Sequence, residues 1–121
     1  MRSFRAALFT LSLLILSIIV LSAAGGRHID AYRREIPDED AELTEAAKML
    51  SALSARLNAE RLLLALLFSH ERCDELESAA ARCAAAARTE ERSEYAILRA
   101  ELLGLLDAME RDLTPHLLDI V

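Results

Sequence analysis

The feature that most constrains this chain is an uninterrupted apolar run near its start, from Ala6 to Ala24. The run contains no charged residue, and its few polar side chains are hydroxyls that can bond to carbonyl groups of their own helix. Its roughly 19 residues span about 28 Å as a helix, close to the ~30 Å hydrocarbon core of a bilayer. Apolar side chains occupy every face, which is not the pattern of an amphipathic surface helix. The run therefore predicts a transmembrane helix that contacts membrane lipid through residues 6–24.

Two interpretations of this run stay open: an uncleaved signal anchor and a signal peptide that is removed. Ser22-Ala23-Ala24 has the small-x-small pattern at which signal peptides are cut, and Gly25-Gly26 would tolerate a cut. The apolar run is longer than the ~7–15 residues of a typical signal-peptide core, and its length favours the anchor.

The orientation in the membrane is predicted from the flanking charges and from the short N-terminal tail. Arg2 and Arg5 favour a cytoplasmic N-terminus, whereas Arg27, Arg33 and Arg34 favour the opposite orientation. A signal-like start with so short a tail normally sends the following chain across the membrane. We expect a single-pass protein of the cytoplasmic membrane with its C-terminal domain outside. The alternative is a domain secreted after cleavage near Ala24.

The rest of the chain has the composition of a small, acidic, helical domain. Leu, Ala, Glu and Arg dominate, and the 121 residues include three Gly, two Pro and no Trp. Such a composition favours helices and offers little for strands. The whole chain has a net charge of −6; without Arg2 and Arg5, 12 basic residues face 20 acidic ones, which gives −8. An acidic domain is not expected to bind nucleic acid or anionic lipid.

The chain divides into a signal anchor at 1–26, a juxtamembrane connector at 27–37 and a helical bundle domain at 38–121. Arg27–Ile36 is expected to extend the membrane helix or to form a short helical turn, with Tyr32 at the lipid interface and His28 in solvent. Pro37 and the three acidic residues after it suit the first turn of the next helix.

Three amphipathic helices are predicted in the domain, over Ala41–Phe68, Glu71–Arg88 and Glu91–Leu113. Ser69-His70 separates the first two, and the serine is expected to cap the second of them. Thr89 is the expected N-cap of the last helix, which should end by Thr114 because Pro115 comes next. The apolar tail after Pro115 is expected to dock on the domain. The predicted fold class is all-α: an N-terminal transmembrane helix followed by a small antiparallel three-helix bundle.

Two segments are predicted to contact a protein partner or a second copy of the chain. Seven apolar residues cannot cross a bilayer, so the run 62–68 is either buried by its neighbours or exposed to a partner. Its contact residues are Leu62, Leu63, Leu66, Leu67 and Phe68. The second segment is a stripe of small residues at heptad spacing, Cys73, Ala80, Cys83 and Ala87.

No catalytic, cofactor-binding or metal-binding residue is assigned. The chain lacks a Gly-x-Ser-x-Gly motif, a Gly-rich phosphate loop and an ordered Ser/His/Asp set, so no enzymatic activity is expected. Four residues that could bind zinc share one face of a predicted helix. One short helix cannot supply all four ligands of a tetrahedral zinc site without a second element. These residues are His70, Cys73, Asp74 and Glu77.

The two cysteines, Cys73 and Cys83, lie ten residues apart in one predicted helix. That spacing is about 15 Å along the helix axis, whereas a disulfide needs Cα atoms within about 7 Å. They are therefore expected to be buried free thiols. A bridge between two chains in an oxidising exterior is the alternative.

Three short segments of the chain resemble the small membrane-anchored bacterial proteins numbered 4363 in the domain-of-unknown-function series. Ser69–Glu77 resembles their His-Glu segment, Thr89-Glu90-Glu91 their polar turn, and Leu117–Ile120 their C-terminal end. That family often has a Trp in its first long helix and an Asn near the C-terminal Ile; this chain has no Trp, and Asp119 stands at the second position. The resemblance implies a membrane location and a helical fold, and no activity.

The leading functional hypothesis is a single-pass, membrane-anchored protein that acts by protein–protein contact, as an accessory subunit of another membrane protein. The alternative is an exported ligand- or metal-binding sensor domain, with His70 and Cys73 as its ligands.

Overall fold

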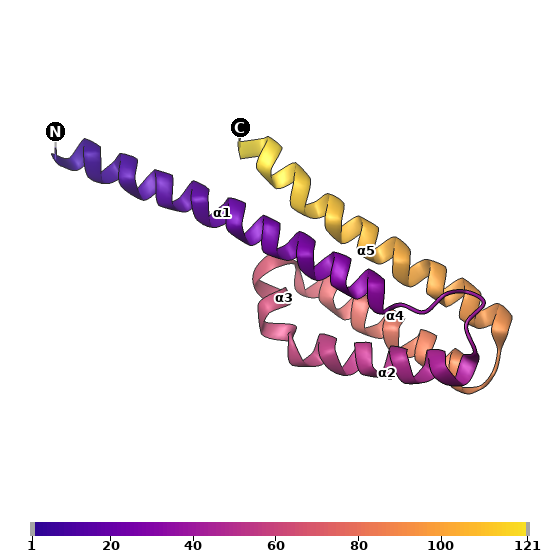
Figure 1. The fold of residues 1–121 in the computed structure, drawn as a ribbon. Helices are drawn as coiled ribbons and strands as arrows, with labels where there is room; N and C mark the ends of the chain where they lie inside the picture. Colours follow the sequence, from indigo (N-terminus) through magenta and orange to yellow (C-terminus); the bar gives the residue numbers. More distant parts are fainter. Residues whose placement is uncertain (1, 121) are drawn as a thin grey trace.

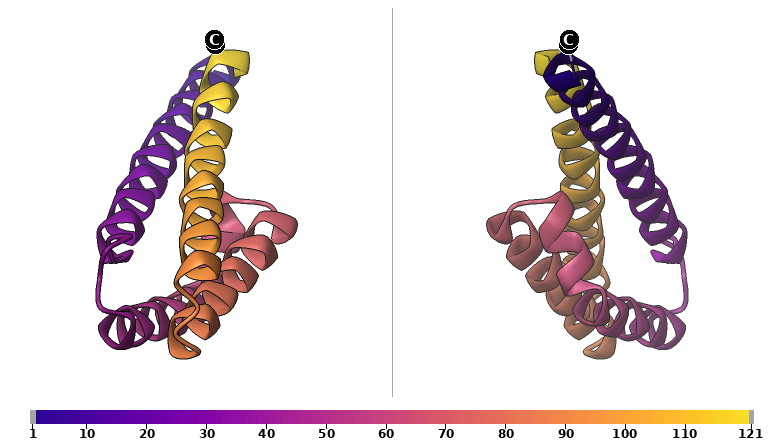
Figure 2. Two further views of the ribbon diagram at one scale, coloured as in Figure 1. Left: turned by 90° about the vertical axis from the view of Figure 1, so that its right-hand side faces the viewer. Right: turned by 90° about the vertical axis from the view of Figure 1, so that its left-hand side faces the viewer.

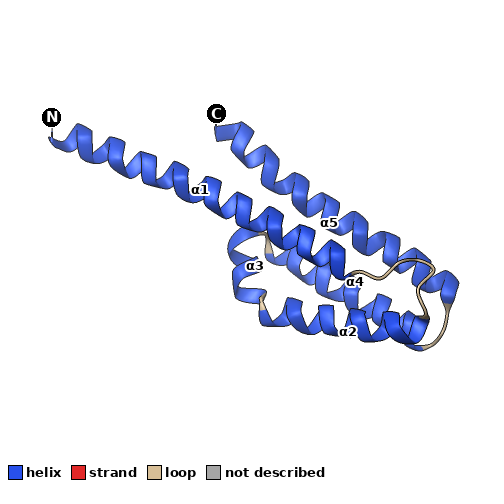
Figure 3. Cartoon of the chain, in the orientation of Figure 1, coloured by secondary structure: helices blue, strands red, loops and turns tan. Residues whose placement is uncertain are grey.

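The computed structural model describes the backbone of residues 2–120 and the side chains of residues 2–113. Its elements are α1 (Arg2–Glu35), α2 (Leu43–Ala59), α3 (Arg61–Leu67), α4 (His70–Arg88) and α5 (Arg92–Ile120). No strand occurs in the described backbone (Figure 3). The predicted all-α class and the long apolar N-terminal helix are therefore confirmed.

The N-terminal half of α1 projects from a bundle that the other helices form with its C-terminal half (Figure 1). From the end of α1 the chain crosses a connector, α2 leads back to α3, and α4 leads away from α3 again (Figure 1). α5 then returns along α1 (Figure 1), and the two helices pack against each other. α4 packs against both α2 and α5, and α5 packs against α1.

α1 passes without a break from the apolar run into the bundle and ends at Glu35, which agrees with the first of the two alternatives for Arg27–Ile36, a continuation of the membrane helix. Its side chains are exposed along the apolar run, and by length and composition it can cross a membrane. At its other end Ile29 and Tyr32 are fully buried. The expected position of Tyr32 at a lipid interface is wrong, because the bundle encloses the ring.

The core takes side chains from all five helices. It includes Ile29 and Tyr32 of α1, Leu64 of α3, and a set of small residues on α4 that lets its neighbours approach closely. A bundle of three helices is therefore not confirmed, since the end of α1 and the short α3 are also part of the core. The small residues of α4 are Cys73, Ala79, Ala80, Cys83, Ala84, Ala86 and Ala87.

The single helix predicted over Ala41–Phe68 is wrong, because the structure ends α2 at Ala59 and begins α3 at Arg61. Glu60 lies between them with φ −95° and ψ 11°. The phenol of Tyr32 donates a hydrogen bond to Glu60. The break therefore coincides with a contact to a residue 28 positions away in the sequence.

The segment from Pro37 to Glu42 is a connector and not the first turn of a helix, which corrects a second expectation. Its carbonyl groups bind side chains of α5: Arg99 Nε donates to Pro37 O at 2.7 Å, and the hydroxyl of Tyr95 donates to Asp38 O at 2.9 Å. These bonds hold the connector against α5, and α2 begins only at Leu43.

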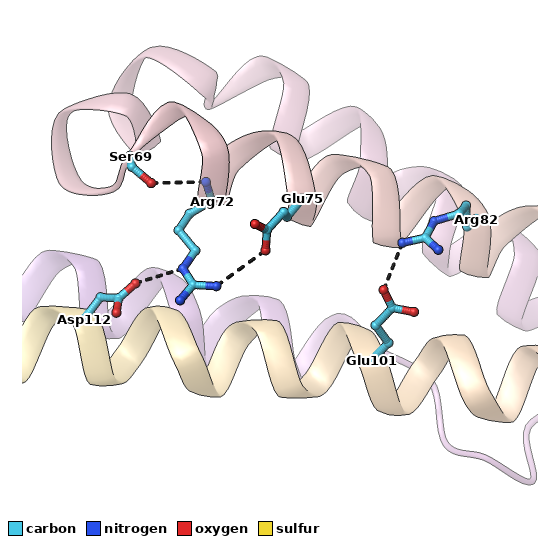
Figure 4. A network of polar contacts seen from close by, with 6 residues as sticks. All are labelled: Ser69, Arg72, Glu75, Arg82, Glu101 and Asp112. Carbon is cyan, nitrogen blue, oxygen red and sulfur yellow. Dashed lines mark hydrogen bonds and ion pairs between the residues drawn. The ribbon is translucent and has the colours of Figure 1, made fainter.

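The predicted cap at Ser69 is confirmed, because its hydroxyl accepts a hydrogen bond from the backbone N–H of Arg72 at 3.2 Å (Figure 4). The side chain of Arg72 crosses to α5, where Nε donates to Asp112 at 3.0 Å, and it also contacts Glu75. A second bridge between the same helices joins Arg82 to Glu101 at 3.0 Å.

Thr89 ends α4 instead of capping α5, which corrects another expectation. Its hydroxyl donates back to the carbonyls of Ala85 and Ala86. The N–H of Glu90 bonds to Ala87 O, and that of Glu91 to Ala86 O, the pattern of a Schellman turn. Glu90 has φ 57°, in the left-handed region that favours glycine.

Replacing Glu90 by glycine is expected to raise the free energy of unfolding by about 1 kcal/mol, because glycine adopts positive φ without the Cβ clash. Urea unfolding of the full chain in detergent micelles, followed by circular dichroism, measures the effect. Glu91→Gly is the matched control and should lower stability. Equal effects of the two changes would contradict a strained Glu90.

The predicted end of the last helix near Thr114 is wrong, because α5 continues through Pro115 to Ile120. Proline removes one helical hydrogen bond, yet it is tolerated in helices that neighbouring elements support. Beyond Leu113 the backbone of α5 extends past the bundle on the same side as the projecting half of α1, with a gap between the two helices in the view of Figure 1. The expected docking of the tail concerns side chains outside those the structure describes.

Candidate functional site

α3 is apolar on two sides, and among the side chains that the structure describes only one of these sides is packed against the rest of the chain. Leu64 and Phe68 are 1% and 7% exposed and belong to the core. Leu67 is partly buried against it. On the other side Leu62, Leu66 and Leu63 are 86%, 77% and 36% exposed. We name these three residues the α3 leucine surface; of the five contact residues predicted in this run, they are the ones exposed.

α3 lies at the end of the bundle from which α1 projects (Figure 1). A Cβ atom built on Gly25 would lie 3.0 Å from Cδ1 of Leu113 and 3.6 Å from Cδ1 of Leu67. The helices α3 and α5 therefore both approach α1 at the first residue after the apolar run. The α3 leucine surface is level with the point where α1 leaves the bundle.

A shallow groove of about 720 Å³ lies between α2 and α4, and a second hollow of about 470 Å³ adjoins it through Ser51 and Arg88. We name the two together the α2–α4 groove. Its lining combines small side chains with charged groups. The larger part is lined by Ser51, Ser54, Ala55, Asn58, Asp74, Glu77, Ser78, Ala81, Ala84 and Arg88.

This groove was not predicted from the sequence. The available signal was the spacing of Ser51, Ser54 and Asn58, which places small polar residues on one side of a leucine-rich helix. That signal cannot show a groove by itself, because the opposite wall comes from α4.

A polar network joins the end of α1 to the junction of α2 and α3. The phenol of Tyr32 donates to Glu60, and Arg56 Nε donates to the other carboxylate oxygen at 3.1 Å. Arg56 also pairs with Glu35, and its guanidinium lies 5.4 Å from the centre of the Tyr32 ring. His28, expected in solvent, has a side chain only 25% exposed and lies 3.6 Å from Glu60.

The charges of this network follow from its geometry. Burial and the bond to Glu60 raise the pKa of Tyr32, so its hydroxyl stays a donor at neutral pH. Burial acts to raise the pKa of Glu60, but hydrogen bonds from Tyr32 and Arg56 outweigh it and hold that pKa below its ordinary value of 4.5. An ionised carboxylate thus joins the end of α1 to the junction of α2 and α3.

The stripe of small residues predicted as an alternative contact surface lies inside the molecule. Cys73, Ala80, Cys83 and Ala87 are each at most 1% exposed. They face the helices on both sides of α4 and are not presented to an outside partner. Both cysteines are free and buried, as expected.

Raising the pH from 9 to 11 is expected to lower the stability of the fold. Burial raises the pKa of Cys83 from its ordinary value of 9.0 to about 11, so in this range the unfolded chain loses a proton that the folded chain keeps. Chemical unfolding at several pH values measures the loss. Cys83→Ala should show a smaller loss, since the buried Cys73 and Tyr32 keep their raised pKa values in both proteins, whereas the variant also lacks the Cys83 charge that raises the pKa of Tyr95. An identical pH dependence would contradict a buried, protonated thiol.

The residues considered as zinc ligands are not brought together. The carboxylates of Asp74 and Glu77 lie 2.7 Å and 3.1 Å from the guanidinium of Arg61. His70 is exposed, whereas Cys73 is buried. Within the described residues no group of three or more His, Cys, Asp or Glu side chains is arranged to hold a metal ion.

Comparison of the chain with known protein families, with curated proteins and with solved structures finds no match. The resemblance to the family numbered 4363 stays a prediction.

Proposed function

We propose that this protein is a single-pass membrane protein without enzymatic activity that acts by protein–protein contact at the outer face of the cytoplasmic membrane. One observation carries the proposal: α1 is one unbroken helix, exposed and apolar in its first half and part of the core in its second. A helix of this kind fixes the position and the orientation of the domain relative to its anchor. Such a fixed domain suits an accessory subunit of another membrane protein.

The α2–α4 groove is the surface best suited to the protein partner. Small side chains in its lining allow the backbone of a partner helix to approach closely. The lining also carries both signs of charge: Asp74 and Glu77, which pair with Arg61, and Arg88, which also lines the second hollow. A helix with small and polar residues on one face would fit it.

The partner contact is tested by filling the groove. Ala81 is exposed and lines the groove, and Ala81→Arg is expected to reduce the recovery of co-purifying proteins at least tenfold from cross-linked membranes. Ala52→Arg is the matched control, because Ala52 is an exposed alanine on α2 outside the groove lining. Equal recovery with both variants, at equal helicity, would refute the groove as the contact surface.

The anchor is tested by the intact mass of the chain recovered from membranes. A mass that includes residues 6–24 is expected, because the domain is then held by the helix that enters its core. A mass that begins near Gly25 would show a released domain and would contradict the proposal.

A further inference from the structure

The α3 leucine surface has no covering element within the described chain. Leu62 and Leu66 are four positions apart, on the same side of α3, and Leu63 adjoins them. All three are leucines, and the side chains of Leu62 and Leu66 are more than three-quarters exposed. Large leucine side chains left in water favour contact with another apolar medium.

The position of α3 indicates that this apolar medium is the membrane. α3 lies across the end of the bundle from which α1 projects (Figures 1 and 2). Leu67 of α3 is near Gly25, directly after the apolar run of α1. When α1 spans the bilayer, α3 is therefore level with the boundary between the hydrocarbon and the headgroups. A helix of seven residues is too short to cross the bilayer but long enough to lie along its surface.

The small area of the surface also favours lipid over protein. Three leucine side chains expose on the order of 300 Å², a size that single monomers commonly carry. A stable protein–protein interface buries about 1,200–2,000 Å² in total.

Arg61 at the start of α3 is paired with Asp74 and Glu77 of α4, so the helix is attached firmly at the end that carries Leu62.

We propose that the α3 leucine surface inserts into the interfacial layer of the leaflet on which the domain stands. This proposal rests on the proposed function, because it requires α1 to span the same bilayer. α1 then crosses the membrane, and α3 lies on its surface. The second contact resists rotation of the domain about the axis of α1.

Site-specific fluorescence in lipid vesicles tests the insertion. The full chain carries one added cysteine labelled with the polarity-sensitive dye NBD, in vesicles of phosphatidylcholine and phosphatidylglycerol. Leu66→Cys reports on α3, and Leu13→Cys on the membrane segment of α1. Ile97→Cys, 66% exposed and near the opposite end of α5, is the aqueous control. The unmodified chain, whose own cysteines are buried, sets the background labelling.

We expect NBD at Leu66 to emit at shorter wavelength than NBD at Ile97 and to be quenched by nitroxide-labelled lipid. Its quenching by aqueous iodide should be at least threefold weaker than that of the label at Ile97. Leu62→Cys, at the most exposed of the three positions, repeats the measurement should the label at Leu66 disturb α3.

Three outcomes would overturn the proposal, and they are distinguishable. A label at Leu66 that behaves like the one at Ile97, with the label at Leu13 quenched by lipid, refutes insertion and leaves the anchor intact. Shielding from both quenchers shows that a protein or a second copy covers the surface. A label at Leu13 that lipid does not quench refutes the anchor itself, and the insertion with it.

Discussion

Replacing Ile29 by alanine is expected to lower the free energy of unfolding by about 2–5 kcal/mol, the usual cost of truncating a fully buried isoleucine. Ile29 is 0% exposed and lies where α1 enters the core beside α5. The cavity left by the substitution therefore weakens the attachment of the anchor helix to the domain. Urea unfolding of the full chain in detergent micelles gives the difference.

The matched control is Ile97→Ala, since Ile97 is helical and 66% exposed. It should change stability by less than about 0.5 kcal/mol. Hydrogen exchange adds a local readout. Relative to the original chain, the Ile29 variant should show a larger increase in amide exchange in the last turns of α1 than in α4. Similar effects of the two isoleucine substitutions would show that the end of α1 does not belong to the core.

The second large effect is expected from Ala80→Leu on α4. Ala80 is 0% exposed, and α4 packs against α2 on one side and α5 on the other. Three added carbon atoms must push the helices apart, because close-packed interiors contain few voids. The expected loss is about 1–3 kcal/mol, measured by the same urea unfolding.

Ala85→Leu separates overpacking from helix propensity. Ala85 lies in the same helix but is exposed, and leucine forms helices almost as well as alanine. This variant should unfold at nearly the same urea concentration as the original chain. A loss as large as that of Ala80→Leu would mean that close approach of α4 to its neighbours is not the reason for the small residues there.

Local signals of the sequence identified the parts of the fold that local physics determines. The charge-free run from Ala6 to Ala24 identified a helix long enough for a membrane, because its length and composition suffice. Ser69 identified the start of α4, because its hydroxyl satisfies an N–H only three residues away.

The predictions were wrong where a contact distant in sequence, or a hydrogen bond to the preceding helix, determines the local structure. Glu60 carries no sign of a helix break, and the break involves Tyr32, which is distant in sequence. Thr89 precedes two acidic residues and so had the pattern of an N-cap, but its hydroxyl bonds to the helix behind it. Pro115 normally ends a helix, yet the backbone of α5 continues through it to Ile120.

The candidate site was predicted in part for the same reason. The apolar run of α3 was visible in sequence, but which leucines are exposed depends on where α3 turns after Glu60. The α2–α4 groove needs both walls, and the pairing of α2 with α4 is tertiary information.

Because α1 is unbroken, its membrane segment and the domain move together as one rigid body. A transmembrane helix adjusts its tilt to the thickness of the bilayer. Because α1 has no hinge between the apolar run and the core, a change of tilt rotates the whole domain with it. α5 extends from Arg92 to Leu113 before it reaches the level of Gly25, about 30 Å at 1.5 Å per residue. A 10° change of tilt would then move the far end of the domain sideways by about 5 Å.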